Sequence, residues 1–268
     1  MTTIAILGTG KIGEALLSGL ITAGRPAESL QFSERAEGRA AELTARYGVR
    51  ATTPSVAAAE ADVLIVAVKP QDIDALISQI APTITPGTLV VSVAAGLPTS
   101  LYESTLPAGT PVVRVMPNTP IVVREAMSAI SPGTYATAEH LQLVQDLLST
   151  VGKVVRVPES QQDAVTALSG SGPAYFFFLV EAMIDAGILL GLPRAVATQL
   201  IIQSAIGSAT MLRDTGEHPV ILREAVTSPG GTTIAAIREL ENHGVRAALL
   251  SAIEAAARRS TELGKAAH

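Results

Sequence analysis

The chain has 268 residues, of which 48% are hydrophobic and 16% are charged, a balance typical of a folded globular protein with a substantial core. Its formal net charge of −5 argues against a nucleic-acid partner, because binding to phosphates usually requires a basic face. The lack of cysteine excludes disulfides, thiolate catalysis and the zinc sites built on Cys ligands.

Short runs rich in Val, Ile and Leu alternate with helical patterns in the first part of the chain. The runs are apolar on both faces, as in a parallel sheet covered on both sides, and they predict strands at residues 4–7, 30–32, 63–68, 89–93 and 112–116. The helical patterns between them occupy residues 12–23, 36–47, 72–80 and 100–106. Strands at 126–130 and 153–157, around a helix at 138–150, extend the sheet at its edge. The alternation predicts an α/β fold with an N-terminal Rossmann-type doubly wound sheet.

Strand patterns stop after residue 158, and an all-α C-terminal domain is expected to follow. The predicted helices are residues 161–168, 173–190, 194–213, 219–226, 232–242 and 245–264. Small residues share helix faces with Leu and Ile, which permits close packing within and between subunits. We therefore place a Rossmann domain at residues 1–158 and a helical domain at residues 159–268.

One apolar stretch, residues 174–192, has much of the length of a membrane span. Glu181 and Asp185 interrupt it on one helical face, and each would cost roughly 2.5–3.5 kcal/mol at a bilayer centre. We interpret it as a helix buried in a core or a subunit interface and expect no membrane partner. The N-terminus lacks the basic region of a signal peptide, so we expect a cytoplasmic protein.

Residues 8–13 form a GxGxxG pattern between the first strand and the first helix. Gly8 allows the tight turn, Gly10 lets the backbone approach a pyrophosphate, and Gly13 lets the helix pack closely on the strand. The N–H groups at the helix start favour phosphates. The pattern predicts a dinucleotide site, with an ordinary glycine-rich turn as the alternative.

The end of the second strand is where selectivity for the ribose is usually set, about 20 residues after the glycines. Glu34 could accept a bond from a 2′-hydroxyl and favour NADH, whereas Ser33 and Arg35 could hold a 2′-phosphate and favour NADPH. We favour NADPH, because a mobile guanidinium can reach the phosphate while the acid turns to solvent. In the alternative, Glu34 and Arg35 are plain surface charges.

Three further loops follow predicted strands, at the edge where such sheets bind ligands. They are Ala-Val-Lys-Pro at 67–70, Ser-Val-Ala-Ala-Gly at 92–96 and Met-Pro-Asn-Thr-Pro at 116–120. The second is small enough for a nicotinamide ring to lie close. Each is either a ligand wall or a simple strand end.

The loop Val-Thr-Ser-Pro-Gly-Gly-Thr-Thr at residues 226–233 leads into a helical pattern. Backbone N–H groups at such a helix start can bind a carboxylate without any arginine. The alternative is that Thr232 or Ser228 is a plain N-cap.

The segment 222–241, centred on this loop, closely resembles the signature of pyrroline-5-carboxylate reductases. Leu-Ser-Gly-Ser-Gly-Pro-Ala-Tyr at 168–175 also matches, and the motifs at 8–13, 67–70 and 116–118 follow the family's order and spacing. The resemblance extends over essentially the whole chain. It implies an NAD(P)H-dependent oxidoreductase that reduces 1-pyrroline-5-carboxylate to L-proline, the last step of proline biosynthesis.

The resemblance and the glycine pattern together assign roles to residues. The cofactor, NADPH with NADH possible, is expected at Leu7, Gly8, Thr9, Gly10, Lys11, Ile12, Gly13, Ser33, Arg35, Ala67, Val68, Lys69, Pro70, Ala94 and Ala95. The substrate is expected at Glu159, Val226, Ser228, Gly231, Thr232 and Thr233. The hydroxyl of Thr233 is the expected catalytic group, bonded to the ring nitrogen or its proton.

The resemblance also implies a homodimer through the helical domain, within a larger ring such as a decamer.

Hydride transfer to an imine needs orientation and polarisation rather than a protein nucleophile or a metal. None of the four histidines, His140, His218, His243 and His268, has ligand-like spacing, so we expect them at the surface or at helix ends.

Two rival functions remain at this point. A β-hydroxyacid dehydrogenase or a ketopantoate reductase needs a lysine or similar acid, and the helical domain has only Lys265. A nucleotide-sensing protein would not need the loop at 226–233 intact.

Overall fold

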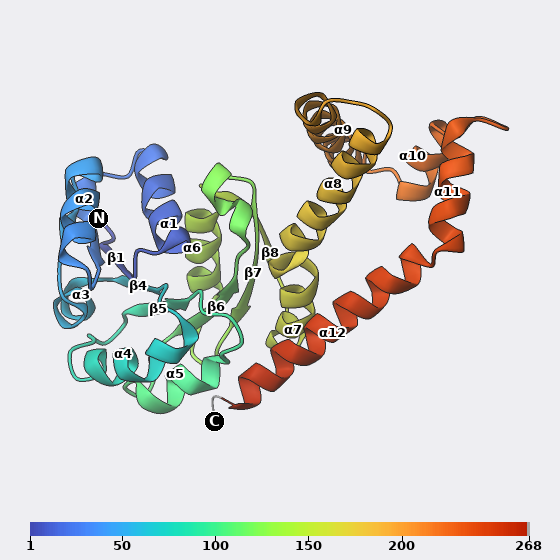
Figure 1. Ribbon diagram of the computed structural model, residues 1–268. Helices are drawn as coiled ribbons and strands as arrows, with labels where there is room; N and C mark the ends of the chain where they lie inside the picture. The colour runs from blue at the N-terminus through green and yellow to red at the C-terminus, as the bar shows by residue number, and fades with distance from the viewer. Residues whose placement is uncertain (267–268) are drawn as a thin grey trace. The chain divides into compact units, whose positions relative to one another are not determined.

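The structure, a computed structural model, describes residues 1–266 and divides into two compact units (Figure 1). The first unit contains residues 1–171 and the chain from Ala256 onward, and the second contains residues 172–255. The last helix therefore belongs to both units. The sequence-based division after residue 158 does not coincide with the boundary between these compact units, and as a division of functions it stays a prediction.

The first unit is built on one eight-stranded sheet, as expected for a doubly wound fold. Its strands, in spatial order, are β3 (Arg50–Ala51), β2 (Leu30–Ser33), β1 (Ile4–Leu7), β4 (Val63–Val66), β5 (Leu89–Ser92), β6 (Val112–Met116), β7 (Ala126–Pro132) and β8 (Gly152–Arg156). Strands β1 to β6 run parallel, β7 is antiparallel to β6, and β8 is parallel to β7. The strand order reverses between β1 and β4, which is where such folds bind dinucleotides.

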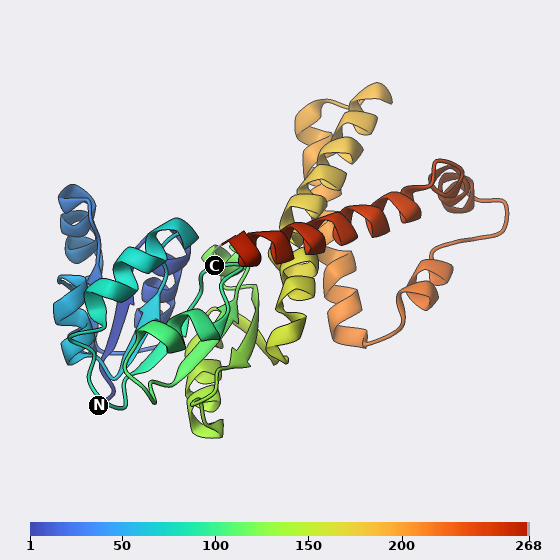
Figure 2. The same cartoon turned by 90° about the horizontal axis from the view of Figure 1, so that it is seen from below.

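Helices cover both faces of this sheet, because its parallel strands are apolar on both sides. The helices are α1 (Lys11–Thr22), α2 (Glu37–Tyr47), α3 (Pro54–Glu60), α4 (Ile73–Ile80), α5 (Thr99–Thr105) and α6 (Ala138–Leu148). Buried side chains of α1 and α6 form one hydrophobic core with Ile4 and Ile6 of β1. Residues of α3, α4 and α5 form the other core with Ala5 and Leu7, and Figure 2 shows α4 and α5 over that face.

The sequence patterns missed two short elements, strand β3 and helix α3. Strand β3 has only two exposed residues, too few for an alternating pattern. Helix α3 begins at Pro54 after a Thr53 side chain that accepts a bond from the Val56 N–H, a standard start signal. Its run of small alanines carries little periodicity, so the signal is visible only at its first turn.

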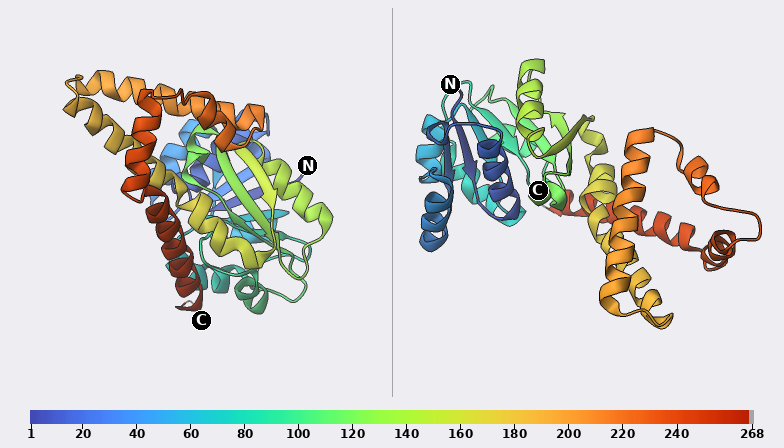
Figure 3. Two further views of the ribbon diagram at one scale, coloured as in Figure 1. Left: turned by 90° about the vertical axis from the view of Figure 1, so that its right-hand side faces the viewer. Right: turned by 90° about the horizontal axis from the view of Figure 1, so that it is seen from above.

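The chain leaves the sheet through short helical segments. These are η4 (Glu159–Gln161), α7 (Gln162–Val165) and the π-helical turn η5 (Thr166–Gly170). The second unit then contains α8 (Gly172–Leu189), α9 (Arg194–Thr215), α10 (Pro219–Ala225), α11 (Thr232–Asn242) and the first part of α12 (Val245–Ala266). Helices α8 and α9 pack side by side (Figure 3). The fold class predicted from the sequence is confirmed, including the helical C-terminal part.

Two segments, Glu159–Leu189 and Arg194–Thr215, are long and apolar enough to cross a membrane by length and composition alone. The helices of soluble proteins that pack in a core or an interface satisfy the same criterion. Much of the apolar surface of α8 and α9 is exposed in the single chain, with Phe177 at 63% and Phe178 at 70%. These helices therefore need an apolar partner surface.

Candidate active site

A cavity of about 410 Å³ opens at the ends of β1, β2 and β4, on the reversal point of the sheet. Predicted cofactor residues that line it are Leu7, Gly8, Thr9, Gly10, Ser33, Arg35, Ala67, Val68 and Lys69. The other predicted ones, Lys11, Ile12, Gly13, Pro70, Ala94 and Ala95, do not line it, although Pro70 and Ala95 line a second cavity of the same unit. The structure thus gathers three separate predicted segments, 7–10, 33–35 and 67–69, around one cavity.

The glycine turn has the geometry that a dinucleotide requires. Gly8 has a φ of +93°, and an added Cβ would lie 2.8 Å from Val68 Cγ1. A Cβ on Gly13 would collide with the Gly8 carbonyl, whereas one on Gly10 would meet no atom within 4 Å. Gly10 therefore leaves open space at the start of α1, where a pyrophosphate can meet the helix N–H groups. The residues present fit the cofactor.

Glu34 is not turned to solvent, which corrects one expectation about the end of β2. Its carboxylate accepts bonds from the Thr9 hydroxyl, at 2.7 Å, and from the Ala36 N–H, at 3.1 Å. Burial would raise the pKa of Glu34, but these hydrogen bonds outweigh it and hold that pKa below its usual value. The carboxylate is thus an ionised group fixed across the glycine turn.

Arg35 lies at the cavity but already has an ionic partner. Its Nη2 is 2.7 Å from Asp72 Oδ2, and 79% of its side chain is exposed. Asp72 lines the same cavity in η2 (Pro70–Asp72), directly after the Ala-Val-Lys-Pro motif. A 2′-phosphate would therefore have to compete with Asp72 for the guanidinium.

Sequence reasoning missed several residues of this cavity, namely Pro54, Gln71, Asp72, Ala75, Leu76 and Gln79. All of them belong to α3, η2 or α4, or follow the Ala-Val-Lys-Pro motif directly. The position of Gln71 and Asp72 in a loop after a strand was the one signal available. That α3 contributes a residue to the cavity could be recognised only from the fold.

The structure brings together two motifs that lie about 50 residues apart. Asn118 Nδ2 donates to the Ser169 carbonyl, at 3.3 Å, and its Oδ1 accepts from the Met127 N–H, at 2.9 Å. A Cβ on Gly170 would lie 2.5 Å from Met116 Cε. The Met-Pro-Asn loop is thus packed on the Leu-Ser-Gly-Ser-Gly segment, and glycine at 170 permits that contact.

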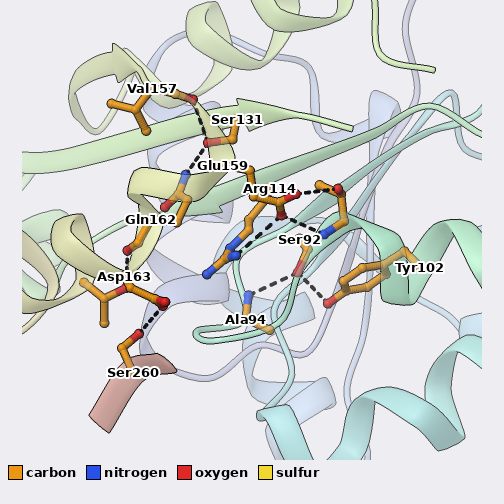
Figure 4. Close-up of polar contacts among 12 residues, drawn as sticks. Ser92, Ala94, Tyr102, Arg114, Ser131, Val157, Glu159, Gln162, Asp163 and Ser260 are labelled. Carbon is orange, nitrogen blue, oxygen red and sulfur yellow. Dashed lines mark hydrogen bonds and ion pairs between the residues drawn. The ribbon is translucent and has the colours of Figure 1, made fainter. Parts of the chain in front are cut away.

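Glu159, an expected substrate residue, has structural partners inside the first unit (Figure 4). Its two carboxylate oxygens accept from the Thr99 N–H, at 2.7 Å, and from the Thr99 hydroxyl, at 2.8 Å. Arg114, 6% exposed, donates to the same carboxylate over 3.4 Å. Glu159 therefore binds the first turn of α5 and balances the positive charge of the buried Arg114. Its contact with substrate stays a prediction.

The loop after β5, which contains Ala94 and Ala95, is held from inside the fold. The Ser92 hydroxyl accepts from the Ala94 N–H, at 3.3 Å, and lies 2.5 Å from the Tyr102 hydroxyl (Figure 4). Burial raises the pKa of Tyr102 to about 12, although the bond with Ser92 lowers it. This loop is thus fixed by neutral hydroxyl groups of the core.

In the second unit, helix α11 begins with open N–H groups. Its N-cap is Gly231, with no side-chain bond, so neither Thr232 nor Ser228 has the plain capping role. The first bond of the helix runs from the Ala235 N–H to the Gly231 carbonyl, at 3.4 Å. The N–H groups of Thr232, Thr233 and Ile234 therefore have no intrahelical acceptor. The helix start is open, and its role in binding an anion stays a prediction.

Comparison with known proteins assigns both parts of the chain. Residues 159–263 match the family model for pyrroline-5-carboxylate reductase dimerisation, and residues 3–96 match that for NADP oxidoreductases, coenzyme F420-dependent. A pyrroline-5-carboxylate reductase of Corynebacterium melassecola is 52% identical, over 99% of this chain and 100% of that protein. The chain belongs to the pyrroline-5-carboxylate reductase family.

Solved structures agree with that membership. A pyrroline-5-carboxylate reductase of Coxiella burnetii has a TM-score of 0.93 and 34% identity, with 98% of each chain covered. The pyrroline carboxylate reductase of Plasmodium falciparum, solved with NADP bound, has a TM-score of 0.88 and 27% identity, again with 98% of each chain covered. The family resemblance inferred from the sequence is confirmed, as are the oxidoreductase class and the NAD(P) class of cofactor.

Family membership also gives the exposed helices a partner. The dimerisation model covers α8 and α9, which expose large apolar side chains, and the chain is a homo-oligomer. The histidines of the described residues lie at helix ends, as expected. His140 completes a capping box on α6, His218 caps α10 and His243 follows α11, whereas His268 lies outside the described residues.

Proposed function

We propose that this chain reduces 1-pyrroline-5-carboxylate to L-proline with NADPH, as the last step of proline biosynthesis. The open N-terminus of α11 carries the assignment, because its first N–H groups have neither an intrahelical acceptor nor a capping side chain and can bind a small carboxylate. Family membership and the dinucleotide cavity of the first unit support it independently.

The substrate-binding residues of this proposal are Glu159, Val226, Ser228, Gly231, Thr232 and Thr233. Within the loop, Gly230 has a φ of +69° and the Gly231 N–H donates to the Ser228 carbonyl, at 3.1 Å. This turn leads the chain directly into α11, so the N–H groups of successive residues form the start of that helix. A carboxylate bound there gains charge-assisted bonds and the positive end of the helix dipole.

The cofactor-binding residues are those of the glycine turn and the strand ends named above, from Leu7 to Gly13, with Ser33, Arg35, the 67–70 segment, Ala94 and Ala95. When bound, the reduced nicotinamide supplies the hydride that the imine carbon accepts. The chain's own residues bind the dinucleotide and the carboxylate, and so fix the two reacting carbons relative to each other.

Thr233 is the proposed catalytic residue. Its hydroxyl donates a hydrogen bond toward the ring nitrogen, or accepts one from its proton, and so stabilises the iminium character that makes the carbon electrophilic. When the hydride adds to the carbon of the protonated imine, the C=N π electrons become the nitrogen lone pair, and the nitrogen keeps its proton as the secondary amine of proline. A side chain without an ionisable group suffices, because the imine nitrogen is itself basic.

We propose NADPH rather than NADH as the preferred cofactor. Ser33 and Arg35 line the cavity at the end of β2, while Glu34 is engaged by Thr9 and Ala36. The carboxylate is thus occupied by the protein, and the guanidinium is exposed and tied only by a surface ion pair, which costs little to break.

The assembly we propose is a homodimer through the helical domain, residues 159–268, arranged in a larger ring such as a decamer, with the Rossmann domain at residues 1–158. The cytoplasm is the proposed location. The exposed apolar side chains of α8 and α9 support the dimer.

The decisive experiment follows NADPH absorbance with the purified protein and two substrates, pyrroline-5-carboxylate and ketopantoate. Oxidation with the imine alone supports the proposal. Oxidation with ketopantoate instead indicates a hydroxyacid-type reductase, and binding of NADPH with no oxidation by either substrate indicates a sensor. The assay therefore separates the three candidate functions.

A further inference from the structure

The last turns of α12 touch the loop that carries Ala94 and Ala95, and both belong to the first unit. A Cβ added to Gly264 would lie 2.9 Å from the Gly96 carbonyl oxygen, a distance that no real Cβ keeps from a backbone atom. On the loop side, a Cβ on Gly96 would lie 3.8 Å from Leu263 Cβ. The two backbones are therefore in direct contact, and glycine at 264 is what permits it.

A carboxylate clasp holds this part of α12 in place. Asp163 of α7 accepts a bond from the Ser260 hydroxyl, at 2.7 Å, and one from the Thr261 hydroxyl, at 2.8 Å. Figure 4 shows Asp163 pointing at Ser260, which is 5% exposed. Ser260 and Gly264 lie four residues apart, so the clasped face of the helix is also the face that meets the loop.

The loop is thus held from two directions. From the core, Ser92 accepts the Ala94 N–H and lies beside the Tyr102 hydroxyl. From outside, Gly264 lies against Gly96, whose φ of +79° makes the bend in the loop. A cavity of about 620 Å³ lies between the loop and α12. It is lined by loop residues Ala95, Gly96 and Leu97 and by α12 residues Ala256, Arg259, Ser260 and Leu263.

We propose that the Asp163 clasp and Gly264 hold this loop in the position that receives the nicotinamide end of the dinucleotide. Asp163, Ser260 and Gly264 are then positioning residues, which act through Ala94 and Ala95. The inference rests on the proposed function, because that function assigns these two alanines to the cofactor. It adds that the C-terminal helix, and not the Rossmann sheet alone, sets the cofactor's reactive end.

Gly264→Ala tests the contact without weakening the helix, since alanine is a better helix former than glycine. We expect NADPH affinity to fall about tenfold, in the range that one extra methyl group in a packed contact produces. Adenosine 2′,5′-bisphosphate, which lacks the nicotinamide, should bind with unchanged affinity, because the cavity at the glycine turn is untouched. Both dissociation constants can be measured by calorimetry on the full-length protein.

Gly38→Ala is the matched control. Gly38 is an exposed helical glycine of α2, and an added Cβ there meets no atom within 4 Å. It should leave both affinities unchanged. Equal NADPH affinity in the two glycine variants would overturn the proposal, as would an equal loss of NADPH and bisphosphate binding in Gly264→Ala.

Asp163→Ala provides a second route, which decides the matter if Gly264→Ala does not fold. It should weaken NADPH but not the bisphosphate, and Asp163→Asn, which keeps an acceptor for one hydroxyl, should restore part of the affinity. Full NADPH affinity in Asp163→Ala would contradict the role of the clasp. Since these readouts do not use pyrroline-5-carboxylate, a wild type that fails to reduce the imine refutes the proposed function and leaves this test standing.

Discussion

Tyr102 is a buried titratable side chain of α5 whose pKa is strongly raised. It is 1% exposed and bonds Ser92, beneath the loop that carries Ala94. Its pKa rises from an ordinary 10.0 to about 12, because burial disfavours the charged phenolate. The folded state thus keeps a proton that the unfolded chain loses first.

This shift gives a pH dependence with a defined sign. The stability contribution of Tyr102 is fully present below pH 10 and is lost as the pH rises through about 12, a loss of about 2–3 kcal/mol. We expect the free energy of unfolding of the wild type to fall more between pH 10 and 12 than that of Tyr102→Phe. Urea titrations at several alkaline pH values measure both, and parallel curves would show that the phenol titrates normally.

Thr233→Ala should lower kcat by roughly 10²–10⁴-fold, the usual range for a positioned polarising or proton-transfer group. NADPH affinity should not change, because the substitution lies outside the dinucleotide cavity. Thr227→Ala is the control in the same loop, since its hydroxyl bonds the Arg223 carbonyl and has no assigned role. Steady-state kinetics decide the matter, and near-normal turnover of Thr233→Ala would remove Thr233 from the mechanism.

Arg35→Ala should weaken NADPH by about tenfold or more while changing NADH little, since a charged hydrogen bond contributes about 1.5–3 kcal/mol. The opposite change is expected for Asp72→Asn, which frees the guanidinium from its ion pair and should strengthen NADPH selectively. Dissociation constants for both cofactors measure these effects. Equal losses of affinity for NADPH and NADH in Arg35→Ala would mean that the arginine does not bind the 2′-phosphate.

At the scale of elements, Glu159 joins three of them, since it lies in η4, binds the start of α5 and faces Arg114 of β6. One Arg114 nitrogen, Nη2, is buried without a hydrogen-bond partner, so Glu159 is the counter-charge on which this arginine depends. Removing one member of a buried ion pair leaves the other buried without a counter-charge. Glu159 is therefore a polar link between η4, α5 and β6.

Glu159→Ala should lower the free energy of unfolding by about 3–5 kcal/mol, because it uncaps α5 and leaves a buried guanidinium unpaired. Glu159→Gln, which keeps an acceptor for the Thr99 N–H, should lose less. Chemical denaturation compares the three proteins. If KM for the imine rises strongly while stability stays near that of the wild type, Glu159 acts as the substrate contact that the resemblance implies and not as a structural link.

At the scale of the whole molecule, the helical unit is incomplete as a single chain. Helices α8 and α9 expose large apolar side chains, among them Phe177, Phe178 and Leu189. Contiguous apolar surface of this kind marks an interface. Membership in a family with a dimerisation segment over these residues gives the partner, a second copy of the chain.

Phe178→Asp should therefore shift the protein toward monomers, because burying one Phe side chain contributes about 1.5–3 kcal/mol and a symmetric interface counts it twice. Sedimentation velocity over a range of concentrations measures the shift. Tyr135→Asp, at a 48% exposed aromatic position of the first unit, is the control and should keep the wild-type oligomer. An unchanged oligomer in Phe178→Asp would place the interface on another face.

Much of the fold could be predicted from the sequence, because its signals are local. Apolar runs gave seven of the strands, and the helical ranges agree to within a few residues, except that β3 and α3 were missed. The glycine turn at 8–13 was predicted with its geometry, since a tight turn and a close helix approach each require a residue without a side chain. The loop at 226–233 was likewise predicted to lead into the open start of a helix.

Local patterns were therefore enough to predict most strands and helices, the family and two candidate binding turns, because each pattern is formed by residues close together in the chain. Which side chains are free to act depends instead on contacts between distant segments. Glu34 is bound by Thr9, Arg35 by Asp72, and Ser260 by Asp163, over separations of 25, 37 and 97 residues. Such pairings depend on how distant segments pack, and hydrogen bonds and ion pairs form only when packing brings both partners within about 3 Å.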